Sequence, residues 1–232
     1  MVSKIKAVIF DLDNTLLDFV EAKLKACKAV VEYLGINENE HELLNYFLRG
    51  IHGFEDVRNI ADYMKDRGVY CDERYRECCE IYENVKLENV ELYPNVRETL
   101  EKLKEMRMKL AVVTDAMNGH AINRMRKAGI LHYFDVVVSS DMTGKRKPEP
   151  DSIILALNKL GVKAEETVIV GDSLRRDIEA GKRLGMITVY AAYGDRNFFE
   201  EKRGSADFVI EDIGELIGLL DSFVPKTKIS NR

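Results

Sequence analysis

The sequence predicts an α/β protein, with a Rossmann-like parallel sheet flanked by helices and a helical bundle inserted after the first strand. Three observations support this fold class. A short apolar run at residues 7–10 stops at acidic residues, residues 17–87 show helical periodicity without a strand pattern, and after Pro94 short Val- and Ile-rich runs alternate with helical segments. Such unbroken apolar runs are typical of strands buried on both faces. Their alternation with helices indicates βαβ units with right-handed crossovers.

The first predicted strand ends at a pair of acids. Asp11 follows the apolar run directly, and Asp13 lies two positions later. Side chains two positions apart on an extended chain point the same way, so both carboxylates converge at the carboxyl end of the strand. Open α/β sheets bind ligands at this end. Converging carboxylates repel each other, and either a bound cation or a proton on one of them would relieve the repulsion.

The helical block is predicted to form a domain of its own. Apolar residues recur every three or four positions from Val20 to Leu34, and Gly35 is typical of a helix C-terminus. Further helices are predicted over residues 40–48, 55–67 and 72–87. We expect residues 17–91 to form this helical domain, and residues 1–16 with 92–232 to form the α/β core.

The core continues with polar residues at or after its strand ends. Strands are predicted over residues 110–113, 134–138, 167–170, 187–190 and 208–210, and helices over 95–105, 117–127, 151–160, 174–184 and 213–223. The polar residues that follow these strands are Thr114, Asp115, Lys147, Asp172 and Asp177. Parallel strands share one carboxyl edge, so these side chains are expected to meet the first two acids there. Carboxylates suit Mg²⁺, and an ammonium with a hydroxyl suits a phosphate.

Composition argues against several classes of function. The net charge is −5 and no dense basic block occurs, which argues against a nucleic-acid-binding surface. No stretch approaches the roughly 18 apolar residues of a membrane span. The N-terminus runs directly into the first strand without the apolar region of a signal peptide, so we expect a cytoplasmic protein with no membrane partner.

Two residue types bear on the environment of the protein. Cys27, Cys71, Cys78 and Cys79 form no CxxC pair and have no histidine at ligand spacing, so we expect buried thiols rather than a zinc site, with a disulfide left open. The chain has no glutamine, and 32% of its residues are charged. This composition is typical of a thermophilic source, and biased genomic composition is the alternative.

Four motifs occur in order, at strand ends or in the loops that follow. They are Asp11-Leu-Asp-Asn-Thr15, Val112-Val-Thr114, Lys147-Pro-Glu-Pro150 and Gly171-Asp-Ser-Leu-Arg-Arg-Asp177. Together they resemble the four motifs of the haloacid dehalogenase (HAD) superfamily, and the resemblance covers essentially the whole chain. The inserted helical block resembles the C1-type cap of that superfamily. Asp13 points to the phosphatase branch, because the dehalogenases and phosphonatases of the superfamily lack an acid there.

This resemblance implies a Mg²⁺-dependent hydrolase of a small phosphomonoester, acting through an aspartyl-phosphate. Asp11 is the implied nucleophile, and Asp13 the implied general acid and base. The implied phosphate-binding groups are Thr114, Lys147 and the backbone amide of Asp115. The implied Mg²⁺ ligands are the Asp11 carboxylate, the Asp13 backbone carbonyl and Asp172. The residues implied to support these ligands without binding the ion directly are Asp177, Ser173 and Thr15.

Substrate choice is expected to lie in the helical domain, where Arg49, His52 and Phe54 surround two glycines. Triose and other sugar phosphates, phosphoglycolate and nucleoside monophosphates all fit the implied chemistry. A sugar-phosphate mutase and a non-catalytic binding module remain as alternatives. So do plain structural roles: Thr114 and Ser173 as helix caps, and the loop with Arg49 as an ordinary interhelical turn. A homodimer and a monomer are both compatible with the sequence.

Overall fold

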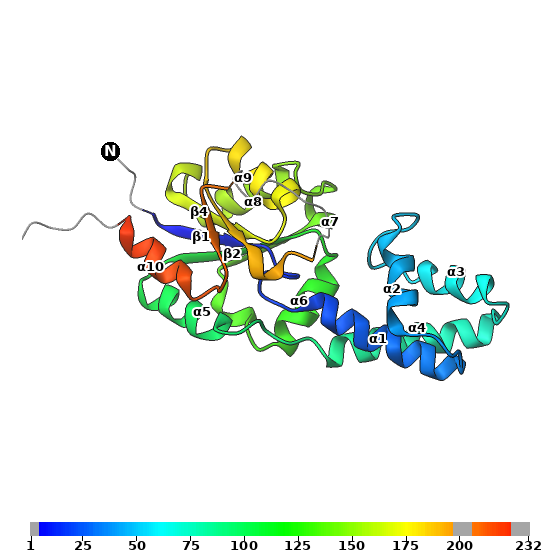
Figure 1. The fold of residues 1–232 in the computed structure, drawn as a ribbon. Coiled ribbons are helices and arrows are strands. Elements are labelled where there is room, and N and C mark those ends of the chain that lie inside the picture. The colour runs from blue at the N-terminus through cyan, green and yellow to red at the C-terminus, as the bar shows by residue number, and fades with distance from the viewer. Residues whose placement is uncertain (1–4, 197–205, 224–232) are drawn as a thin grey trace, which may run out of the picture. The chain divides into compact units, whose positions relative to one another are not determined.

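The computed structural model describes residues 5–196 and 206–223. In these ranges the chain builds one six-stranded sheet of parallel strands, in the order β3-β2-β1-β4-β5-β6 (Figure 1). The strands are β1 (Ala7–Phe10), β2 (Lys109–Thr114), β3 (Val136–Ser139), β4 (Thr167–Gly171), β5 (Ile187–Ala191) and β6 (Phe208–Ile210). The predicted α/β class with a parallel sheet is therefore confirmed.

The register of the central strands brings the ends of β1, β2 and β4 together. Phe10, the last residue of β1, pairs with Val112 of β2 and with Val170 of β4. The amide of Asp11 continues this ladder by donating a hydrogen bond to the Val170 carbonyl at 2.9 Å. Whatever follows these strands is thus held at one edge of the sheet, where open α/β sheets bind ligands.

Helices cover both faces of the sheet. They are α5 (Val96–Glu105), α6 (Asn118–Lys127), α7 (Ser140–Thr143), α8 (Asp151–Leu160), α9 (Glu179–Arg183) and α10 (Glu215–Ser222). Helices α8 and α9 lie on one side of the sheet, and α5 and α10 lie on the other (Figure 1). One buried cluster joins Ile9, Val113 and Ile169 of the sheet to Ile153 and Ala180 of the first pair of helices. Alternate residues along each strand therefore serve opposite faces.

The predicted helix over residues 174–184 differs in its first turn. The chain forms a π-helix, η3 (Leu174–Ile178), before α9 begins. The Ser173 carbonyl accepts both from the Asp177 amide at 2.9 Å and from the Ile178 amide at 3.2 Å, which marks the wider turn. Hydrophobic spacing alone does not distinguish a wide turn from an α-helical one.

The predicted strand over residues 134–138 begins later, at Val136. The Asp135 carboxylate accepts hydrogen bonds from the Leu110 amide at 2.8 Å and from the Lys104 ammonium at 3.2 Å. The Asp135 amide in turn donates to the Leu110 carbonyl at 2.9 Å. A side chain that bonds to the neighbouring strand thus shifts the start of the ladder.

The chain divides into two compact units, one holding residues up to 18 and from 92 onward, the other Phe19–Glu91. The second unit contains α1 (Phe19–Leu34), α2 (Glu40–Leu48), α3 (Arg58–Asp66) and α4 (Asp72–Glu88), packed around a shared apolar core. Helix α3 begins later than the predicted residue 55, because the Asp56 carboxylate accepts the Arg58 amide at 2.9 Å. The role of this unit as a cap stays a prediction.

All four cysteines are free thiols. Cys27 and Cys78 are buried, as expected for structural thiols, but Cys71 is exposed. The expectation of a buried thiol is wrong there, because Cys71 precedes α4 instead of lying on its packed face. Over the two described ranges, every helix is too short or too polar to cross a membrane.

Candidate active site

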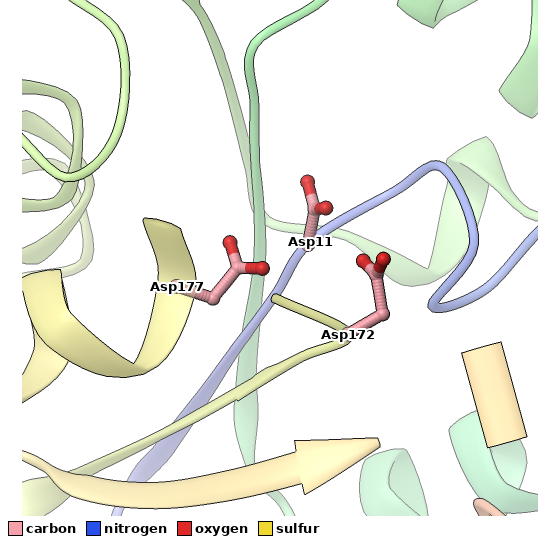
Figure 2. A group of neighbouring side chains, drawn as sticks. All are labelled: Asp11, Asp172 and Asp177. Carbon is pink, nitrogen blue, oxygen red and sulfur yellow. The ribbon is translucent and has the colours of Figure 1, made fainter. Parts of the chain in front are cut away.

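Three carboxylates meet at the edge of the sheet. Asp11 follows β1, Asp172 follows β4, and Asp177 lies in η3; their side chains gather around one point (Figure 2). One oxygen from each lies within 4.8 Å of the others. The three residues are 5%, 2% and 0% exposed. Three carboxylates this close together and this well buried create a strongly negative local potential.

The ammonium of Lys147 lies among these acids. Its Nζ is 2.6 Å from Asp11 Oδ1 and 2.6 Å from Asp177 Oδ1, and it donates to the Val113 carbonyl at 2.9 Å. Burial would lower the pKa of Lys147, but the attraction of Asp11, Asp177 and Asp115 outweighs burial and raises the pKa. Lys147 is therefore a fixed cation, held beside Asp11 at the edge where open α/β sheets bind ligands.

One ammonium does not balance the acids. The pKa of the Asp172 carboxyl is raised well above its usual range, chiefly by burial and then by the charges of Asp11 and Asp177. Burial also raises the pKa of Asp177, although Lys147 opposes this. Clustered, desolvated carboxylate oxygens are the donor set that hard divalent cations prefer, so these residues fit such an ion.

The wide turn of η3 and a glycine together place Asp177. A Cβ atom on Gly171 would lie 2.4 Å from the Asp177 Cβ, so only glycine leaves room for that side chain to cross the end of β4. Asp177 Oδ2 accepts the Ser173 amide at 3.1 Å, and Ser173 Oγ accepts the Arg176 amide at 3.3 Å. The Gly-Asp-Ser sequence and the position of the second acid thus form one local structure.

The remaining predicted core residues lie around the acids. Thr15 Oγ1 donates to Asp172 Oδ1 at 3.2 Å, and its role beside a predicted Mg²⁺ ligand stays a prediction. Thr114 Oγ1 accepts the Ala116 amide at 3.1 Å, so this hydroxyl also organises the turn after β2. The Asp115 carboxylate, which had no predicted contact, accepts the Lys147 amide at 3.0 Å.

Sequence reasoning missed two arginines at this edge. Arg176 Nη1 lies 3.5 Å from Asp115 Oδ2, and Arg124 Nη1 lies 2.6 Å from Asp13 Oδ2. The side chain of Asp13 is thus bound by a guanidinium from α6, while its neighbour Asp11 contacts Lys147. Arg176 stands inside the fourth motif, which was a usable signal. Arg124 gave none, because basic residues near a helix C-terminus are ordinary.

The predicted specificity residues lie in the helical unit, two of them on one carboxylate. Asp62 Oδ2 is 2.6 Å from Arg49 Nη2 and 3.0 Å from His52 Nε2. Phe54 instead covers the Lys23 ammonium, with its ring centroid 3.6 Å from Nζ and its carbonyl accepting a hydrogen bond. These contacts fix the loop, and a role in substrate choice stays a prediction.

Comparison with known proteins decides the family. Residues 8–191 match the model of the haloacid dehalogenase-like hydrolases. The chain belongs to this family. It is 34% identical to the glyceraldehyde 3-phosphate phosphatase of Methanocaldococcus jannaschii, over 93% of this chain and 97% of the relative. It is 30% identical to the phosphoglycolate phosphatase of Aquifex aeolicus, over 94% and 98%. The predicted superfamily and phosphatase class are confirmed.

A solved structure supports the same assignment. A putative β-phosphoglucomutase from Thermotoga maritima superposes with a TM-score of 0.79 at 26% identity, covering 94% of this haloacid dehalogenase-like chain and 99% of the other. The fold of the described residues is therefore that of the family.

Proposed function

We propose that the protein is a Mg²⁺-dependent phosphomonoesterase that acts on a small phosphorylated metabolite through an aspartyl-phosphate on Asp11. The observation that carries this proposal is the contact of Lys147 with both Asp11 and Asp177, beside a third buried acid. A nucleophilic carboxylate, a phosphate-binding cation and a set of hard oxygen ligands thus lie within a few ångströms of one another.

The residues divide the chemistry between them. Asp11 Oδ forms a bond to phosphorus while the bond from phosphorus to the leaving oxygen breaks, and Asp13 gives its proton to that oxygen. Water then attacks the phosphoryl group, its proton passes to Asp13, and the bond to Asp11 breaks to release phosphate. Lys147 and Thr114 hold the phosphoryl oxygens through both displacements.

Asp11, Asp172 and the Asp13 carbonyl would hold the Mg²⁺, with Asp177 and Thr15 orienting them. Bound there, the ion would lower the repulsion between the Asp11 carboxylate and an anionic substrate. The raised pKa of Asp172 supports this placement, because its principal causes are burial and neighbouring negative charge.

The substrate is proposed to be a phosphorylated metabolite of a few carbon atoms. The relatives named above are phosphatases of glyceraldehyde 3-phosphate and of phosphoglycolate. Larger sugar phosphates and nucleoside monophosphates should be tested as substrates beside these two compounds. Arg49 and His52 are the proposed specificity residues, and phosphate release from each compound by wild type and by Arg49→Met tests them.

Hydrolysis of p-nitrophenyl phosphate tests the reaction itself. We expect turnover with Mg²⁺, loss of turnover on chelation, and a kcat at least about 10⁴-fold lower in Asp11→Asn, because the nucleophile is gone. The exposed Asp141→Asn serves as the matched control. Equal rates in wild type and Asp11→Asn would refute the proposal.

A sugar-phosphate mutase is the second candidate, because the structural neighbour from Thermotoga maritima is described as a putative β-phosphoglucomutase. A mutase returns the phosphoryl group to a sugar, whereas a phosphatase releases it. Stoichiometric phosphate release from sugar phosphates without an added bisphosphate would exclude this candidate.

A further inference from the structure

A guanidinium lies against the proposed general acid and base. Arg124 Nη1, from α6 of the core unit, is 2.6 Å from Asp13 Oδ2. The arginine side chain is 3% exposed and the carboxylate 18% exposed. Arginine is almost never fully buried unless it is paired. Arg126 lies two positions further along the same helix and is exposed, as expected for a basic residue near a helix C-terminus.

The chemistry of a guanidinium restricts what Arg124 can do. It stays protonated in proteins, so it cannot supply the proton that the leaving oxygen needs. It can fix the rotamer of a carboxylate, because its planar donors demand a defined geometry. It can also stabilise the negative charge that remains once Asp13 has given up its proton.

We propose that Arg124 is a positioning residue for Asp13. It holds the Asp13 carboxyl group in the orientation that serves first the leaving oxygen and then the attacking water. This inference rests on the proposed function, in which Asp13 performs both proton transfers. In the first transfer the proton moves from Asp13 to the leaving oxygen, and the carboxylate formed stays beside Arg124. In the second, the proton of water returns to that carboxylate.

The contact between Arg124 and Asp13 could also inhibit catalysis. A tight ion pair could hold the Asp13 carboxylate away from the phosphate, so that the ion pair would have to break before the reaction. Removing Arg124 would then raise the rate. The sign of the effect therefore distinguishes a positioning contact from an inhibitory one.

The test compares two monoesters whose leaving groups differ. p-Nitrophenolate departs without protonation, whereas the alkoxide of glycerol phosphate needs a proton. We expect Arg124→Met to lower kcat/KM for glycerol phosphate about 100-fold, because a positioned general acid contributes at least about 100-fold. For p-nitrophenyl phosphate, whose leaving group needs no proton, we expect kcat/KM to fall no more than about tenfold. Arg124→Lys should recover part of the loss, and Arg126→Met should match wild type.

The ratio of the two kcat/KM values is the decisive readout, because the fraction of folded enzyme cancels within one preparation. An equal loss on both substrates, or a gain on glycerol phosphate, would overturn the inference. If Arg124→Met has no activity, the ratio in Arg124→Lys decides: we expect it to fall below the wild-type ratio, and an unchanged ratio would overturn the inference.

A second variant pair places the effect on Asp13. In an Asp13→Asn background, adding Arg124→Met should not change the ratio further, because the group it positions is already gone. A further fall would assign Arg124 another role. Failure of the proposed function looks different: wild-type enzyme with Mg²⁺ would hydrolyse neither monoester.

Discussion

The two units of the protein each bury a lysine, but they do so in different ways. In the core, Lys147 contacts the carboxylates of Asp11 and Asp177. In the helical unit, the ammonium of Lys23 lies 4.1 Å from the ring centroid of Phe47 and 3.6 Å from that of Phe54. Both side chains are almost completely withdrawn from solvent.

The difference indicates two uses of a buried cation. Ring faces and a backbone carbonyl are among the partners of Lys23, and they tie it to a loop within its own unit. The carboxylates around Lys147 repel one another, so that ammonium is one part of an unbalanced charge cluster that favours a further cation. The first arrangement stabilises a fold, and the second is suited to binding.

Replacing each lysine by methionine should show the largest effect. We expect Lys147→Met to lower kcat/KM at least about 100-fold, since a preorganised donor to the phosphoryl group is lost. Lys23→Met should have a much smaller effect on kcat/KM. It should lower the free energy of unfolding by about 1–2 kcal/mol as the contacts with the rings disappear. Steady-state kinetics and chemical denaturation measure the two quantities, and similar kinetic losses would break the comparison.

The core site should also depend on a close backbone contact that has no counterpart around Lys23. A Cβ atom on Gly194 would lie 1.6 Å from the Asn14 carbonyl oxygen, in the loop that carries Asp13 and Thr15. We expect Gly194→Ala to cost about 1–3 kcal/mol of stability through overpacking. A displacement of the loop by about 1 Å would lower kcat up to about 100-fold.

Gly218→Ala is the matched control for this prediction. Gly218 lies in α10 with no heavy atom within 4 Å of an added Cβ. The alanine there should raise the free energy of unfolding by about 0.5–1 kcal/mol, because alanine has the higher helix propensity, and it should leave kcat unchanged. A kcat in Gly194→Ala equal to that of the control would show that the close contact is dispensable.

The smallest expected effect concerns the helical unit alone, where thiol labelling measures how well each cysteine is shielded. Burial raises the pKa of the Cys27 thiol to about 12 and that of Cys78 to about 11. Both thiols therefore stay protonated and shielded near neutral pH, whereas Cys71 is exposed. Native protein should label first at Cys71, and at Cys27 only on unfolding. Rapid labelling of Cys27, read by peptide mass spectrometry, would show that the core around α1 opens easily.

Much of the candidate site follows from the positions of the strand ends in the sequence. Parallel strands must end at one edge, and Asp11, Lys147 and Asp172 lie together there as expected. The contact between Asp13 and Arg124 joins residues far apart in the chain, and it depends on how α6 packs. The wide turn of η3 was equally hidden, since the buried Leu174 and Ile178 have the spacing of an ordinary α-helix. Neither feature has a local pattern in the sequence.

The π-helix also bears on how this part of the chain tolerates a change in length. Its wide turn spans one residue more than an α-helical turn. Deleting one residue between Ser173 and Asp177 would therefore leave an ordinary helical turn, in which the Ser173 carbonyl accepts one amide instead of two. Because each residue turns a helix by about 100°, the Asp177 side chain would leave the position beside Lys147 that it reaches across Gly171. The length of this segment is thus as strict a requirement of the site as the identity of its acids.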